Sequence, residues 1–165
     1  RGSLRCGRCR VVRRVVNVEV QLAVQDSAVP ETPAILLWID TTFQAVPHHL
    51  SEITVRVVGK SEMRSLNSRF RGQGKSTNVL SFPSVRTPDI ASGVSGDIAI
   101  CAAVVRSEAA EQHKTLEAHW AHMTVHAVLH LCGYDHTNEV DAGIMETLEA
   151  EVLDKLGFTD PYTVS

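Results

Sequence analysis

Three histidines lie within one eleven-residue segment, HAVLHLCGYDH, at positions 126–136. His126 and His130 are four residues apart and would share one face of a helix, and Gly133 would turn the chain so that His136 folds back toward the last helical turn. Three neutral imidazoles leave a fourth position on zinc open for water, whose pKa falls to about 7. The spacing therefore predicts a catalytic type of metal site formed by His126, His130 and His136.

The neighbouring polar residues are assigned to other roles. His122 shares the helix face, but it would lie roughly 12 Å along the axis from His130, whereas both nitrogens must approach one ion to about 2 Å. We therefore expect His122, like His113 and His119, to be structural. Asp135 could orient a ligand histidine or simply shape the turn. Zinc is the expected ion, although imidazole also suits nickel, copper and iron.

Zinc peptidases use a similar helical pair of histidines, with a general-base glutamate directly after the first ligand. In this chain that position is Ala127, and no acid lies between the two helical histidines. A peptidase of that kind would lack its base. Cleavage of a phosphodiester can proceed without this glutamate if a nearby cation stabilises the charged transition state.

A candidate for that cation lies in a basic stretch between residues 56 and 75, where Glu62 is the one acidic residue. The segment FRGQGKST at 70–77 is rich in glycine, and glycine lets the backbone approach a phosphate closely. We expect Arg69 and Lys75 to contribute to substrate binding, with a solvated charged face as the alternative. The basic residues are Arg56, Lys60, Arg64, Arg69, Arg71 and Lys75.

Strand and helix patterns are interleaved along the chain. Alternating apolar residues and turn signals predict strands over 17–24, 53–57, 78–83 and 96–101, with loops over 70–77 and 84–95. Caps, apolar spacing and glycine stops predict helices over 34–46, 61–67, 102–112, 116–132 and 138–156. These elements predict an α/β (α+β) domain: a small mixed four-stranded sheet packed with several helices, and a metal site at the end of the long central helix.

The last predicted helix carries apolar residues at every fourth position, which should form its buried stripe. These residues are Val140, Ile144, Leu148, Val152 and Leu156. The acidic residues of the same helix are expected to face water. They are Glu146, Glu149, Glu151 and Asp154.

Length and composition limit the function classes. A chain of 165 residues with 44% hydrophobic residues fits one domain, which we place at 16–165, after an arginine-rich tail or misplaced start at 1–15. The first fourteen residues hold six of the sixteen Lys and Arg, so the rest of the chain has a net negative charge. Any nucleic acid would therefore have to bind to a local basic patch. No apolar run approaches membrane-spanning length, and we expect a cytoplasmic protein with reduced cysteines and no membrane partner.

The motifs resemble those of the YbeY-type bacterial rRNA-maturation endoribonucleases, whose signature H-G-x-L-H-L-x-G-Y-D-H is similar to HAVLHLCGYDH. The segments SLNSRFRGQGKSTNVLSFP and GDIAIC look like the second and third blocks of that family. The resemblance covers about Val18 to Tyr162. It places the three histidines on the metal-ligand positions and Arg71 on a functionally important arginine. Ala127 departs from the usual glycine.

The resemblance implies a zinc-dependent, single-strand-specific endoribonuclease that acts in 16S rRNA 3′-end maturation and ribosome quality control. It implies single-stranded rRNA and ribosomal or small-subunit proteins as partners, and we expect Arg71 to bind the scissile phosphate. Two alternatives remain: a non-catalytic, metal-stabilised ribosome assembly factor and a zinc hydrolase of another substrate class. Either water or the RNA 2′-hydroxyl could be the nucleophile.

Overall fold

The computed structural model describes residues 17–46, 50–84 and 94–163. The predicted tail, His48 and His49, and most of the predicted loop over 84–95 lie outside the described residues. None of the helices in the described part of the chain is long and apolar enough to cross a lipid bilayer.

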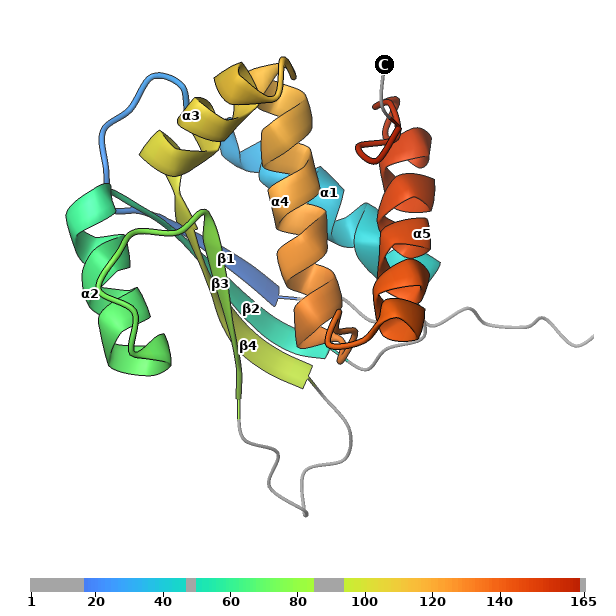
Figure 1. The fold of residues 1–165 in the computed structure, drawn as a ribbon, viewed down its shortest axis with the longest axis horizontal. Coiled ribbons are helices and arrows are strands. Elements are labelled where there is room, and N and C mark those ends of the chain that lie inside the picture. The colour runs from blue at the N-terminus through green and yellow to red at the C-terminus, as the bar shows by residue number, and fades with distance from the viewer. Residues whose placement is uncertain (1–16, 47–49, 85–93, 164–165) are drawn as a thin grey trace, which may run out of the picture.

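Four strands form one mixed sheet in the order β1-β2-β4-β3 (Figure 1). The strands β1, β2 and β4 run parallel, and β3 pairs antiparallel with β4 at one edge. Their bounds are β1 Asn17–Leu22, β2 Leu50–Val58, β3 Val79–Pro83 and β4 Val94–Cys101. The predicted mixed four-stranded sheet is confirmed, with β4 beginning two residues before its predicted start.

The described residues form five helices, which lie on both sides of the sheet, and the molecule is a single small α+β domain, as predicted (Figure 1). The hydrophobic core consists of two clusters, one on each face of the sheet, because successive residues of a strand point to opposite faces. In β4, Ile98 and Ile100 face α1 and α4, while Ala99 and Cys101 face α2. The helix α5 packs on α1 and α4. The bounds are α1 Thr32–Ala45, α2 Lys60–Arg71, α3 Ala102–Glu111, α4 Leu116–Leu131 and α5 Glu139–Lys155.

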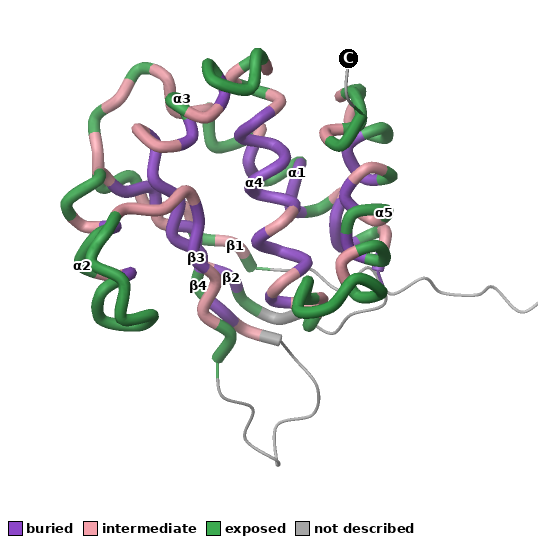
Figure 2. The backbone as a smooth tube through the Cα atoms, in the orientation of Figure 1, coloured by how far each residue is buried: buried purple, intermediate pink, exposed green. Residues whose placement is uncertain are grey.

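The central helix α4 is the most buried helix of the described fold (Figure 2). Its sequence is apolar on nearly all sides, and Trp120, Val125 and Leu129 have no exposed surface. The Thr115 hydroxyl caps its start by accepting a hydrogen bond from the Ala118 amide. Because α4 is held between the sheet and α5, side chains in its last two turns have fixed positions.

Gly96 lets the end of α4 approach the sheet closely. A Cβ at this position would lie 2.6 Å from Leu131 Cδ2 and 2.9 Å from the Phe82 carbonyl oxygen. We expect Gly96→Ala to lower the free energy of unfolding by about 1–3 kcal/mol, because the helix end and the strands must separate. Chemical denaturation measures this change.

Gly143 in α5 provides the matched control for this substitution. A Cβ there meets no atom within 4 Å, so Gly143→Ala should stabilise the helix by up to about 1 kcal/mol. Equal denaturation midpoints for Gly96→Ala and the unmodified chain would show that the close approach at Gly96 has no energetic consequence.

The helix α2 is longer than the sequence predicted. The prediction ended it at Asn67 and placed 70–77 in a glycine-rich loop, but the helix continues to Arg71. Gly72 ends it in the left-handed conformation, with a φ of 67°, and its amide donates to the Ser68 carbonyl at 3.0 Å. Arg69 and Arg71 therefore lie on the last turn of a helix.

Candidate metal centre

The end of α4 brings the three predicted ligands together. His126 and His130 lie on its last turns, and Gly133 follows with a φ of 97°. The Gly133 amide donates to the His130 carbonyl and the Tyr134 amide to the Leu129 carbonyl, at 3.0 and 3.1 Å. This pair of bonds is the Schellman arrangement, which reverses the chain and returns His136 to the helix end.

The three imidazoles converge on one point. The Nε2 atoms of His126 and His130 are 3.2 Å apart, and one ligand atom from each of the three histidines lies within 4.8 Å of the others. Two nitrogens at 2.0–2.1 Å from a tetrahedral zinc ion would be separated by about 3.3 Å. His126, His130 and His136 could therefore hold a metal ion.

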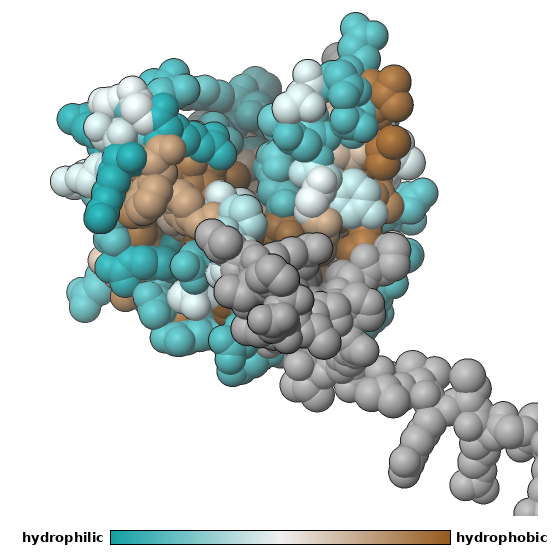
Figure 3. Space-filling view, turned by 90° about the horizontal axis from the view of Figure 1, so that it is seen from below, coloured by the Kyte–Doolittle hydropathy of each residue, from teal (hydrophilic) through white to brown (hydrophobic). Residues whose placement is uncertain are grey.

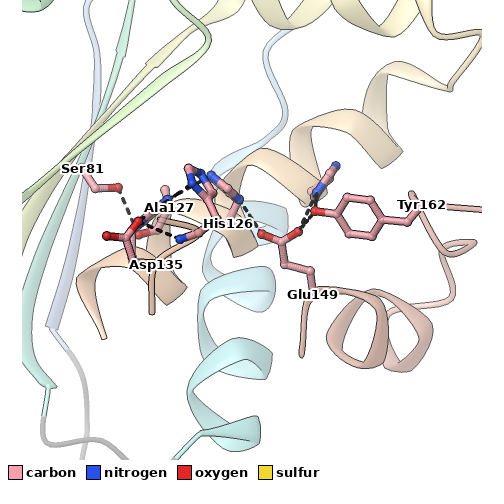
Figure 4. Close-up of polar contacts among 9 residues, drawn as sticks. Ser81, His126, Ala127, Asp135, Glu149 and Tyr162 are labelled. Carbon is pink, nitrogen blue, oxygen red and sulfur yellow. Dashed lines mark hydrogen bonds and ion pairs between the residues drawn. The ribbon is translucent and has the colours of Figure 1, made fainter. Parts of the chain in front are cut away.

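A buried carboxylate, Glu149, adjoins this cluster (Figure 4). Its Oε1 lies 2.5 Å from His126 Nδ1, and its Oε2 lies 3.0 Å from His122 Nε2 and accepts a hydrogen bond from the Tyr162 hydroxyl. The prediction that Glu149 faces water is wrong, since the residue has no exposed surface.

The error at Glu149 comes from the geometry of α5. Residues four apart advance by about 400° around a helix, so a four-residue stripe drifts by about 40° per step. The stripe consequently leaves the core at its start, where Val140 and Ile144 are 72% and 49% exposed. The buried face includes Met145, Glu149 and Val152, whose spacing of four and then three residues was the signal that sequence analysis missed.

The charges at this site favour metal binding. Burial alone would raise the pKa of Glu149, but hydrogen bonds from His122, His126 and Tyr162 outweigh it and lower the pKa to about 2. Burial, together with the nearby His126 and His136, lowers the pKa of His130, which keeps a lone pair on its ring at neutral pH. An ionised Glu149 only accepts hydrogen bonds, so His126 Nδ1 donates to it and His126 Nε2 is the ring nitrogen turned toward His130.

A family model described as Endoribonuclease YbeY matches residues 21–157, which is most of the chain. The chain belongs to the YbeY endoribonuclease family. Membership confirms the predicted resemblance and implies an rRNA-processing endoribonuclease, a hydrolase that acts on RNA. The chain is also similar to the solution structure of TM1509 from Thermotoga maritima, with 22% identity over 89% of this chain and 99% of that one and a TM-score of 0.52. That similarity concerns the fold alone.

Ala127, the departure from the YbeY motif, belongs to the hydrophobic core. The residue is fully buried between α4 and the sheet, and its carbonyl accepts a hydrogen bond of 3.1 Å from the Ser81 hydroxyl of β3 (Figure 4). The extra methyl group is therefore buried in the hydrophobic core and adds no exposed surface to the site.

The other polar residues near the YbeY motif have separate partners. The buried His119 lies 2.8 Å from Glu108 through its Nε2, which fits the structural role expected of it. Asp135 Oδ1 accepts from the His136 backbone amide at 2.7 Å, but it is 3.9 Å from His136 Nδ1. Asp135 thus shapes the turn, and orientation of the His136 ring by Asp135 stays a prediction. Burial raises the pKa of the Cys132 thiol to about 12, which fits a packing role.

The predicted basic residues lie across the edge strand from the histidines. The α2 helix packs on the opposite sheet face from α4, and its Phe70 ring contacts Phe82 of β3 at 4.9 Å between centroids (Figure 1). Since the Phe82 carbonyl lies beside the end of α4, both helices end at the same end of the sheet. Seen from that end, hydrophilic side chains predominate on the α2 side, whereas the α5 side also exposes hydrophobic ones (Figure 3).

No hydrogen bond or ion pair joins the side chains of Arg69, Arg71 or Lys75 to the histidines within residues 17–46, 50–84 and 94–163. The Arg69 guanidinium instead lies over the Phe70 ring, 5.4 Å from its centroid. The structure thus assembles the predicted metal ligands and leaves the predicted phosphate-binding residues on the far side of β3.

Proposed function

We propose that the protein is a zinc-dependent, single-strand-specific endoribonuclease that matures the 3′ end of 16S rRNA and serves ribosome quality control in the cytoplasm. The convergence of three histidine nitrogens within 4.8 Å, in a member of an endoribonuclease family, carries the proposal. Zinc bound there would supply a Lewis acid that activates water at neutral pH.

Residues on the two sides of β3 would have different roles, metal binding on one side and phosphate binding on the other. His126, His130 and His136 would hold the ion, and Arg71 would bind the scissile phosphate through its planar guanidinium group. Arg69 and Lys75 would contact neighbouring phosphates. A single strand bends easily enough to follow the sheet edge and present its scissile phosphate to both the ion and Arg71, whereas a stiff duplex would not; this supports the proposed preference for unpaired RNA.

A cleavage assay with chelation tests this proposal. An end-labelled single strand carrying the 16S rRNA 3′ end is incubated with the protein, alongside the same strand annealed to its complement. We expect cleavage of the single strand, a loss of at least about a hundredfold after chelation, and recovery on addition of zinc.

Several outcomes of this assay would contradict the proposal. Cleavage that survives chelation would exclude a metal-dependent mechanism, and equal cleavage of the duplex would exclude strand specificity. RNA binding without turnover would favour the ribosome assembly factor, and hydrolysis of esters or peptides alone would favour a different zinc hydrolase. The end groups of the products identify the nucleophile, because attack by the 2′-hydroxyl leaves a cyclic phosphate.

A further inference from the structure

One carboxylate receives three hydrogen-bond donors beside the histidine cluster. Glu149 comes from α5, His122 and His126 from α4, and Tyr162 from the segment that follows α5 (Figure 4). His122 and Tyr162 both contact Oε2, and among the described residues Oε1 has a hydrogen bond with His126 alone. Tyr162 also lies beyond residue 157, where the match to the family model ends.

This arrangement selects one tautomer of His126. A carboxylate with three donors around it has no proton to give, so the proton between Glu149 and His126 resides on Nδ1. In the neutral ring, the form that binds a metal, the other nitrogen, Nε2, then carries the lone pair, and this atom faces His130 Nε2 at 3.2 Å. The opposite tautomer would place a hydrogen atom where a metal must bind.

The donors on Oε2 hold the carboxylate in this orientation. Glu149 has no exposed surface, so rotation of its carboxylate would leave the buried His122 ring and the Tyr162 hydroxyl without their acceptor. Leaving buried donors unpaired costs about 1–3 kcal/mol each. Glu149, His122 and Tyr162 therefore form one hydrogen-bonded unit, defined here as the Glu149 network.

We infer that the Glu149 network is a positioning device for the metal site: His122 and Tyr162 fix Glu149, and Glu149 fixes His126 with its Nε2 lone pair directed at the ion. The inference rests on the proposed metal-dependent function. Glu149 and Tyr162 are positioning residues, since they act through His126 and contact no proposed substrate.

Zinc affinity provides the first test. Competition with a chromophoric chelator measures the dissociation constant of the full chain for zinc, with thermal melts to verify folding. We expect Glu149→Gln to weaken zinc binding by about 10- to 100-fold, and Tyr162→Phe, which keeps the ring, to weaken it by a smaller factor. Glu151→Gln makes the same chemical change at an exposed position of α5 and should leave the affinity unchanged.

The tautomer of His126 provides the second test, and it needs no metal. Nitrogen-15 NMR of the metal-free protein should show a protonated Nδ1 on His126 in the unmodified chain and in Glu151→Gln. In Glu149→Gln a substantial population should move its proton to Nε2. A role in packing alone would change stability without changing this signal.

The outcomes separate this inference from the proposed function. Equal zinc affinity for Glu149→Gln and Glu151→Gln, or an Nε2-protonated His126 in the unmodified chain, would overturn the positioning role. Failure of the unmodified chain to bind zinc, with the His126 tautomer as expected and dependent on Glu149, would overturn the proposed zinc site and retain the role of the Glu149 network in setting the tautomer.

Discussion

His130→Ala should lower the rate of RNA cleavage by about a thousandfold or more. The substitution removes one of three proposed ligands, and a metal that acts as a Lewis acid contributes several kcal/mol to the stabilisation of a transition state. His130 makes no hydrogen bond to Glu149, so the alanine leaves the Glu149 network in place. Cleavage of end-labelled single-stranded RNA measures the effect, with bound zinc determined on the same samples.

His113→Asn is the matched control for this experiment. His113 is exposed, lies before α4, and has a φ of 54°, a conformation that asparagine tolerates. Both proteins are purified identically, because contaminating ribonucleases imitate weak activity. If His130→Ala cleaved RNA at the rate of His113→Asn, the histidine cluster would have no part in cleavage.

Arg71→Ala should slow cleavage by about a hundredfold or more while leaving the fold and zinc binding intact. Loss of a donor that stabilises charge in the transition state commonly has an effect of this size. Arg71 is exposed on the last turn of α2, and within the described residues its side chain has no hydrogen bond or ion pair, so its removal should cost little stability. Arg71→Lys should restore part of the rate, because lysine keeps the charge and loses the bidentate geometry.

Arg64→Ala, an exposed substitution on the same helix, controls for the loss of one positive charge. Steady-state kinetics separate the two ways in which Arg71 could act. A fall in kcat for Arg71→Ala would support contact with the scissile phosphate, whereas a rise in KM alone would mean that Arg71 only holds the RNA. Equal rates for Arg71→Ala and Arg64→Ala would remove Arg71 from the mechanism.

The fold was predictable because local patterns and tertiary packing agree in most of the chain. The alternating residues of β2 and the nearly all-apolar α4 are buried as their patterns require, and Val18 and Val20 of β1 are half-buried. The C-terminal boundary of α2 was not predictable from the sequence, since a basic segment with two glycines fits a loop as well as a helix end. The structure shows that the helix reaches Arg71 and that Gly72 ends it in the left-handed conformation.

In the candidate site, too, some residues could be predicted from the sequence and others could not. His126, His130 and His136 could be grouped from the sequence because helix periodicity and one glycine turn determine their relative positions. Glu149 could not be grouped with them, since its place depends on how α5 packs against α4, and a four-residue apolar stripe indicated the wrong face. The basic residues were predicted by composition, but their separation from the histidines by β3 depends on the sheet order.

The short span of the three histidines affects how a metal would be coupled to folding. All three lie within eleven residues, so they stay near one another in the unfolded chain, and any affinity of that chain for the ion reduces the stability gained on binding. Glu149 and Tyr162 follow much later in the sequence and reach His126 and His122 only after α5 has docked. The thermodynamic preference of the ion for folded over unfolded molecules would therefore come from these distant partners more than from the ligands themselves.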